Sequence, residues 1–237
     1  MPFTFAHPAA AIPLARPLGR YGVMSALVIG SMTPDFWIFL PLPVTRGQTH
    51  SLAGLLWFCV PMGVLMYLLF HVALKHPLLS LLPAKYARRV AFHVAGQPRV
   101  PRVRPAGVLA SLLVGSLTHV LWDGFTHWQV HGVSLAQDAS GVLGSALIAW
   151  WSWRWLRSAA DPPTADARMP DILTPRLQCY VGLALLCVML GAALVKAINL
   201  PPWQSHSVPA AIAALQGLVW ALIAYSVMWQ LWRMRRK

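Results

Sequence analysis

One segment of the chain repeats chemically versatile side chains at intervals of four residues. His119, Asp123 and His127 have this spacing, so in a helix they lie along one face. Ser111 and Gly115 extend the stripe with small residues, which would let a neighbouring helix approach closely. Imidazole and carboxylate groups on successive turns can share one metal ion. This mixed nitrogen and oxygen set suits Zn, Mn or Fe more than Ca.

Acidic residues are rare, and two of them lie in apolar surroundings. The six acidic residues are all Asp. Asp35 follows Pro34 at the end of the first long apolar segment, and Asp123 belongs to the stripe described above. A carboxylate at the centre of a bilayer costs about 2.5–3.5 kcal/mol on insertion scales, so it is usually functional or paired. Both residues are therefore candidate ligands.

The first twenty residues have a pattern of their own. His7 precedes Pro8, which suits the first turn of a helix, and Arg16–Arg20 reads as a turn. We expect a helix hairpin, with a short helix starting near Pro8 and a longer return helix that ends near Asp35. Such a hairpin would bring His7 to the level of Asp35. His50 lies in the short polar connection that follows.

A structural interpretation competes with the metal site. A polar side chain inside a span is often only an interhelical hydrogen bond, and His119 and Asp123 could satisfy each other. Asp35 could cap a helix end or face water. Four other histidines have no acidic companion nearby in the sequence, and we assign them structural roles: His71, His76, His93 and His206.

Apolar segments long enough to cross a bilayer set the fold class. Hydrophobic residues make up 57% of the 237 positions and charged residues 11%, against roughly 25% charged in an average soluble domain. A span needs about 20 apolar residues, and the candidates are Tyr21–Leu42, Leu52–Leu74, Ala106–Trp122, Gly141–Leu156, Cys179–Ile198 and Ala210–Trp232. We predict an all-α polytopic membrane helix bundle with about six spans plus a short N-terminal helix. It would form a single integral membrane domain over residues 1–237.

The net charge of +13 is better explained by membrane topology than by nucleic-acid binding. With a cytoplasmic N-terminal arm, every basic residue except Arg46 and Lys196 falls on the cytoplasmic side, as the positive-inside rule requires. Residues 75–105 are then a basic cytoplasmic loop, 158–175 a solvated linker, and the C-terminus is cytoplasmic. Anionic membrane lipids are the expected partners of such loops. Several candidates fall toward the opposite, outer face: Asp35, His50, His119, Asp123 and His127.

Three short segments of the chain resemble a family of bacterial multi-spanning membrane proteins of uncharacterised function. They are Met1-Pro-Phe-Thr-Phe-Ala-His7, Gly30-Ser-Met-Thr-Pro-Asp35 and Thr49-His50-Ser-Leu, and the resemblance runs over most of the chain. More distantly, the pattern is similar to inner-membrane proteins classed as metal-dependent hydrolases, and loosely to zinc-dependent phospholipase C. The resemblance implies a bacterial inner (cytoplasmic) membrane protein with hydrolase-like ligand positions.

The hydrolase-like group has an N-terminal His, a Pro-Asp, an Arg-Gly-x-Thr-His-Ser step and a Ser-His-x-x-x-Asp helix. The matching positions here are His7, Asp35, Arg46 to Ser51, and Thr118 to Asp123. That group also carries an Asp and a His just after the Pro-Asp, and a His before the Arg-Gly. This chain has Trp37, Ile38 and Thr45 there, which weakens the expectation of a second metal ion.

The leading hypothesis is a membrane-embedded metal-dependent hydrolase that acts near the outer leaflet, on a phospholipid or another phosphoester. Its metal ligands would be His7, Asp35, His50, His119 and Asp123, enough for one or two divalent ions, with zinc the first candidate. Asp123 and His127 are the catalytic candidates, His127 as a ligand or a general acid/base. The alternative is a non-enzymatic transporter or assembly factor whose polar stripe lines an ion or proton pathway.

Overall fold

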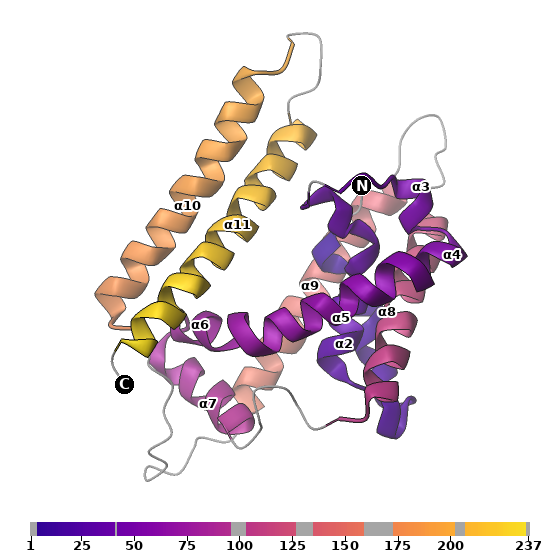
Figure 1. Ribbon diagram of the computed structural model, residues 1–237, viewed down its shortest axis with the longest axis horizontal. Helices are drawn as coiled ribbons and strands as arrows, with labels where there is room; N and C mark the ends of the chain where they lie inside the picture. Colours follow the sequence, from indigo (N-terminus) through magenta and orange to yellow (C-terminus); the bar gives the residue numbers. More distant parts are fainter. Residues whose placement is uncertain are drawn as a thin grey trace. The chain divides into compact units, whose positions relative to one another are not determined.

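A computed structural model describes residues 4–40, 42–95, 103–126, 135–158, 173–201 and 207–235 of the chain. Every regular element in these ranges is a helix (Figure 1). Contacts divide the chain into two compact units, one formed by Met1–Leu69 with Pro101–Ser158 and the other by Phe70–Val100 with Ala159–Lys237. Each unit is described by itself.

The first unit combines short helical turns with two long helices. Its short elements are η1 (Thr4–Ala6), α1 (Pro8–Ala11), η2 (Ile12–Ala15), η3 (Gly19–Tyr21), α2 (Met24–Gly30), η4 (Thr33–Ile38), α3 (Arg46–Thr49), α4 (Leu52–Gly54), η5 (Leu55–Cys59) and α5 (Val60–Leu69). Its long helices are α8 (Pro105–Thr126) and α9 (Leu135–Ser158). The polar residues of interest lie in this unit.

The second unit contains η6 (Phe70–Leu74), α6 (Lys75–Ser80), α7 (Ala84–Ala95), α10 (Pro175–Ile198) and α11 (Ser207–Met234). Helices α10 and α11 pack side by side (Figure 1). Glutamine side chains on α10 and α11 donate hydrogen bonds to backbone oxygens of η6, of α6 and of the residues just after α6. Gln178 Nε2 donates to the carbonyl oxygens of Ser80 and Leu82 at 3.0 and 2.8 Å, and Gln230 Nε2 donates to the Ala73 oxygen at 3.1 Å.

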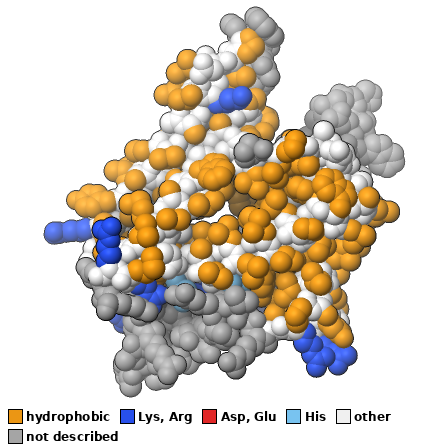
Figure 2. All heavy atoms as spheres, in the orientation of Figure 1, with side chains coloured by type: hydrophobic (Ala, Val, Ile, Leu, Met, Phe, Trp, Pro, Cys, Tyr) orange, Lys and Arg blue, Asp and Glu red, His pale blue; other side chains and the backbone are white. Residues whose placement is uncertain are grey.

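Four helices in the described part of the chain are long and apolar enough to cross a membrane: Leu52–Ser80, Pro105–Thr126, Pro175–Ile198 and Val208–Met234. This supports membrane localisation, whereas the prediction of six spans is not confirmed. Large apolar side chains are exposed along α10 and α11, and Figure 2 shows hydrophobic side chains over much of the face in view. Lipid contact explains why such surfaces remain uncovered.

The first predicted span, Tyr21–Leu42, is not one continuous helix. The α-helix α2 ends at Gly30, and a 3₁₀ segment, η4, begins at Thr33. Pro34 lacks a backbone N–H, and it disfavours α-helical geometry at the residue before it. Hydroxyl groups take up the freed Gly30 carbonyl oxygen, which accepts from Thr33 Oγ1 at 2.6 Å and from Ser116 Oγ at 3.0 Å.

Small residues bring α2 against α8. A Cβ atom at Gly30 would overlap the backbone of Leu112, and one at Gly115 would overlap the carbonyl oxygen of Leu27. Ser111 strengthens this contact, because its hydroxyl accepts from the Val23 N–H and donates to the Tyr21 oxygen. The small residues that the sequence marked for close helix approach therefore lie at this interface.

The stretch 75–105, predicted to be a basic cytoplasmic loop, holds helices where the structure describes it. α6 continues the long apolar helix, and Lys75 within it is buried, with 7% of its surface exposed. α7 is amphipathic, with Lys85 and Arg88 exposed. Most of the predicted linker 158–175 lies outside the described residues.

Candidate metal centre

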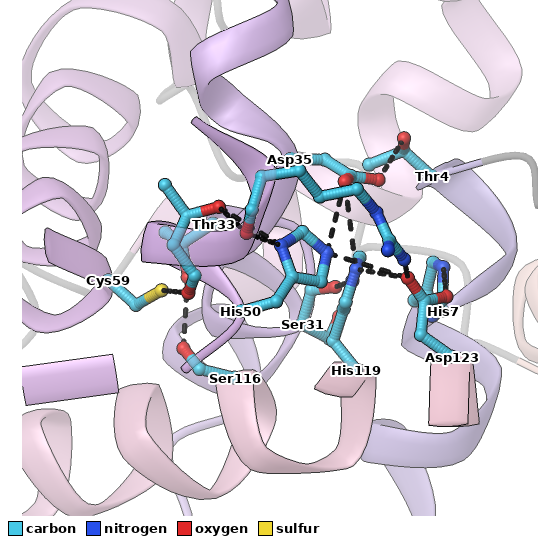
Figure 3. Close-up of polar contacts among 12 residues, drawn as sticks. Thr4, His7, Ser31, Thr33, Asp35, His50, Cys59, Ser116, His119 and Asp123 are labelled. Atoms are coloured by element: carbon cyan, nitrogen blue, oxygen red, sulfur yellow. Dashed lines mark hydrogen bonds and ion pairs between the residues drawn. The ribbon is translucent and has the colours of Figure 1, made fainter. Parts of the chain in front are cut away.

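Polar side chains from four segments of the first unit meet at one place (Figure 3). His7 lies between η1 and α1, Asp35 in η4, and His50 at the end of α3, while His119 and Asp123 lie one turn apart in α8. Their side chains are 0–9% exposed. The structure thus brings together all five residues that the sequence marked as metal ligands.

His119 is fixed by the break in the first apolar segment. Its Nδ1 lies 2.8 Å from the carbonyl oxygen of Ser31, the residue that follows α2. In a continuous α-helix that oxygen would accept from the N–H of Asp35, but the Asp35 N–H bonds to Met32 instead. A carbonyl oxygen only accepts, so Nδ1 of His119 carries the proton. Its Nε2 lone pair is therefore directed at the cluster.

His50 is oriented by its own turn of helix. Its Nδ1 lies 3.1 Å from the Arg46 carbonyl oxygen and 3.0 Å from Thr49 Oγ1. The Thr49 hydroxyl proton is used on that same carbonyl oxygen, so Nδ1 of His50 is again the donor. Metal-binding histidines commonly have their other nitrogen fixed in this way, which sets the tautomer.

Two histidine nitrogens and two carboxylate oxygens form the core of the cluster. His50 Nε2 lies 3.5 Å from Asp35 Oδ1 and 3.4 Å from Asp123 Oδ2. His119 Nε2 lies 3.8 and 3.7 Å from the same two oxygens. Among the described residues, no group of mutually close ligand atoms contains both Asp35 and Asp123, so the two carboxylate oxygens lie farther from each other than from the two imidazole nitrogens.

His7 and Thr4 complete the cluster from the N-terminal segment. His7 Nε2 lies 3.6 Å from Asp123 Oδ1, and its ring stacks on that of His119 with centroids 3.7 Å apart. Thr4 Oγ1 donates to Asp35 Oδ2 at 2.7 Å. The predicted hairpin therefore does bring the N-terminal segment to Asp35, through Thr4.

The imidazole groups occupy different electrostatic environments. Burial, together with the neighbouring His119, lowers the pKa of His7 to about 4. Burial also acts to lower the pKa of His50, but the carboxylates of Asp123 and Asp35 outweigh it and raise that pKa. Among the described residues, neither ring nitrogen of His7 has a hydrogen-bond partner, nor does Nε2 of His50 or His119. A buried polar atom without a partner is costly, and a metal ion would remove that cost for the Nε2 atoms.

Arg46 is a member of the site to which the sequence analysis gave no role. Its guanidinium pairs with Asp123 Oδ2, from α3 across to α8. Its carbonyl oxygen also holds His50. In the sequence it stood out in two ways, as one of two basic residues on the predicted outer side and as the first residue of the Arg-Gly-x-Thr-His-Ser match.

The donor set fits a divalent transition metal. Two groups of three residues have ligand atoms within 4.8 Å of one another: His7, His119 and Asp123, and Asp35, His50 and His119. His119 belongs to both groups and its Nε2 has a single lone pair, so the arrangement suits one ion better than two. Imidazole and carboxylate together favour Zn, Mn or Fe over Ca.

Other predicted residues lie elsewhere. His127, the second catalytic candidate, lies outside the described residues, as does His206. His71, His76 and His93 lie in helices of the second unit. Contacts to backbone oxygens, such as those of Ser31 and Arg46, were not predictable from residue type, since they depend on where a helix breaks.

Comparison with known proteins identifies the family of this chain. No curated protein and no solved structure matches the chain. A family model matches residues 1–227, and its description is a domain of unknown function, DUF4184. The matched range includes every residue of the cluster, and the chain belongs to this family.

Proposed function

We propose that this protein is a membrane-embedded, metal-dependent hydrolase acting on a phospholipid or another phosphoester. One observation carries the proposal: the Nε2 atoms of His50 and His119 each lie 3.4–3.8 Å from a carboxylate oxygen of Asp35 and from one of Asp123. The far nitrogen of each imidazole is held by a backbone carbonyl group. Within the described residues, neither Nε2 atom has a hydrogen-bond partner. A purely structural role, as hydrogen bonds between helices, does not explain this.

The proposed ligands are His50, His119, Asp35 and Asp123, with His7 as a fifth donor beside Asp123. A bound divalent ion would supply hydroxide near neutral pH and polarise a phosphoryl oxygen. Thr4 would hold the Asp35 carboxylate in place through its 2.7 Å hydrogen bond. Proton transfer remains assigned to Asp123 and His127.

Exposed apolar side chains close to the ligands in the sequence support a substrate that resides in the membrane. Leu52 follows His50 by two residues and is 76% exposed, and Phe125 follows Asp123 by two residues and is 78% exposed. Leu56, one turn after Leu52, is 63% exposed. These exposed apolar side chains can contact acyl chains, which suits a lipid as the substrate. We place the site at the outer face of a bacterial inner membrane.

Metal analysis of the protein purified in detergent tests this proposal. Wild type, His119→Ala and Asp123→Ala are compared by mass spectrometry of bound metals, with His76→Ala as the control because His76 lies in the second unit. We expect near-stoichiometric metal in wild type and in the control, and little in the two ligand variants. Release of phosphate or alcohol from phospholipids and a chromogenic phosphodiester is then measured on the same samples.

The outcomes separate the competing functions. Equally low metal content in all four proteins would sink the metal-site hypothesis. Stoichiometric metal without any hydrolysis would favour the transporter or a structural role, with the same polar cluster binding an ion in transit. Hydrolysis that follows metal content across the four proteins would support the enzyme.

A further inference from the structure

Arg46 lies at the boundary between the buried cluster and its surroundings. Its side chain is 40% exposed, whereas that of its partner Asp123 is 6% exposed and that of His119 is fully buried. Within the described part of the chain, Arg46 is the one Lys or Arg residue that forms an ion pair with this cluster; the other pairs involve histidines. A molecule that approaches the metal from outside would therefore meet its guanidinium.

The backbone of Arg46 is held firmly enough to aim the side chain. Arg46 begins α3, and the Gln48 side chain accepts from the Thr45 N–H at 2.9 Å across the start of this turn. The Arg46 carbonyl oxygen accepts from His50 Nδ1 and Thr49 Oγ1. The residue that orients His50 thus also projects the cation, so a single turn of helix links the guanidinium to this candidate ligand.

Charge determines what this cation can do. With neutral imidazoles, the two carboxylates exceed Arg46 by one negative charge, and a divalent ion turns the total to one positive charge. The metal would also compete with Arg46 for Asp123 Oδ2. A guanidinium has five N–H donors in a fork that matches phosphate oxygens in pairs. It would therefore exchange part of its contact with Asp123 for an incoming anion.

We propose that Arg46 is the substrate-binding residue that holds a phosphate group of the substrate beside the metal. The inference rests on the proposed metal-dependent function and adds to it the class of ligand, a phosphate anion. That anion could belong to a lipid headgroup or to a free phosphate compound. A positively charged group at this position also stabilises the charge of a phosphoryl transition state.

Titration calorimetry with inorganic phosphate tests the inference on metal-loaded protein. The variants are Arg46→Gln and Arg46→Lys, and the matched control is Arg16→Gln, which removes one exposed charge elsewhere in the first unit. We expect phosphate affinity to fall about ten- to a hundredfold in Arg46→Gln, as for the loss of a charge-assisted hydrogen bond. The phosphate affinity of Arg46→Lys should lie between those of wild type and Arg46→Gln, because lysine keeps the charge but loses the forked arrangement of N–H donors.

Metal content separates this inference from the proposed function. If the wild-type protein binds no metal, the proposed metal centre itself is wrong. Wild type with metal whose phosphate affinity equals that of Arg46→Gln would overturn the role of Arg46 alone. Arg46→Gln should keep its metal, because the variant removes a competitor for Asp123; loss of metal there would show that Arg46 only supports the ligands.

A lipid arm identifies the source of the phosphate. The same titration is repeated in nanodiscs of phosphatidylcholine with and without phosphatidate. Weaker apparent binding of inorganic phosphate in the phosphatidate nanodiscs, with no such effect in Arg46→Gln, would indicate a lipid headgroup. Unchanged binding in wild type would indicate a free phosphate compound as the ligand of Arg46.

Discussion

His119 is the residue through which the other parts of the centre are joined. Its Nδ1 is held by the Ser31 carbonyl oxygen, and its ring stacks on His7 and meets His50 edge-on at 5.2 Å between centroids. Its Nε2 faces both carboxylates. A side chain with no exposed surface and this many oriented neighbours has a single available position. Its Nε2 is therefore held in a fixed position beside both carboxylates.

Metal affinity should depend on pH through His50. The Asp123 and Asp35 carboxylates raise the pKa of His50, so in the empty site a proton occupies its Nε2 at a higher pH than in an ordinary histidine, whose pKa is about 6.5. The metal must displace this proton. Affinity should be full above the raised pKa and fall as the pH drops through it. His7, with its pKa lowered to about 4, should add nothing in this range.

Competition with a chelator of known affinity, at a series of pH values, measures this dependence. His50→Gln should bind metal more weakly than wild type, and its remaining affinity should not vary with pH in this range, because glutamine has no proton to displace. An affinity in wild type that stays constant through the histidine range, after correction for the chelator, would contradict the argument.

The site was partly predictable at this scale. His119 and Asp123 share a helix, so their spacing alone placed them on one face. His7, Asp35 and His50 lie on separate elements, and their inclusion depended on the hairpin, the topology and the resemblance. The Arg46–Asp123 pair was missed because the two residues are far apart in the chain, and residue type does not specify which long-range ion pair forms.

At the scale of elements, the decisive feature is the break between α2 and η4. The predicted return helix ended near Asp35 and the predicted span ran on to Leu42, whereas α2 ends at Gly30. Hydropathy does not register a lost backbone hydrogen bond, and Trp37 and Ile38 are as apolar as a span requires. The break releases the Ser31 carbonyl oxygen for His119. Without it the histidine would lose its orientation.

Close packing of α2 on α8 should therefore control metal binding as well as stability. Gly115→Ala places a Cβ against the Leu27 carbonyl oxygen, and such overpacking typically costs about 1–3 kcal/mol. We expect a lower melting temperature in detergent and reduced metal content, since Ser31 would move away from His119. Gly124→Ala, in the same helix with nothing within 4 Å of its Cβ position, is the control and should match wild type or exceed it. Equal stability of the two variants would mean that the helices have room to separate.

At the scale of the whole molecule, composition predicted membrane-spanning helices, which the structure supports. The predicted number of about six spans is not confirmed. Four helices qualify by length and composition within the described residues. The predicted span 141–156 falls in α9, which is long and helical but is not among the four. The C-terminal end of α9 carries Arg154, Arg157 and several tryptophans, which lower its mean hydropathy. The guanidinium groups of Arg154 and Arg157 lie over the rings of Trp150 and Trp153. Such cation–π contacts satisfy charges at a helix end, and hydropathy does not register them.

The charge pattern makes a prediction about sidedness. Gly47 and Lys85 are exposed, and the positive-inside rule places Gly47, with the metal centre, outside and Lys85 inside. In a chain whose three cysteines are replaced, Gly47→Cys should react with a membrane-impermeant maleimide on intact bacterial cells. Lys85→Cys should react only after permeabilisation. A chain that keeps only the buried Cys59 controls for unfolded protein and should stay unlabelled. The reverse pattern would place the centre, and any phosphate substrate that it takes, on the cytoplasmic side.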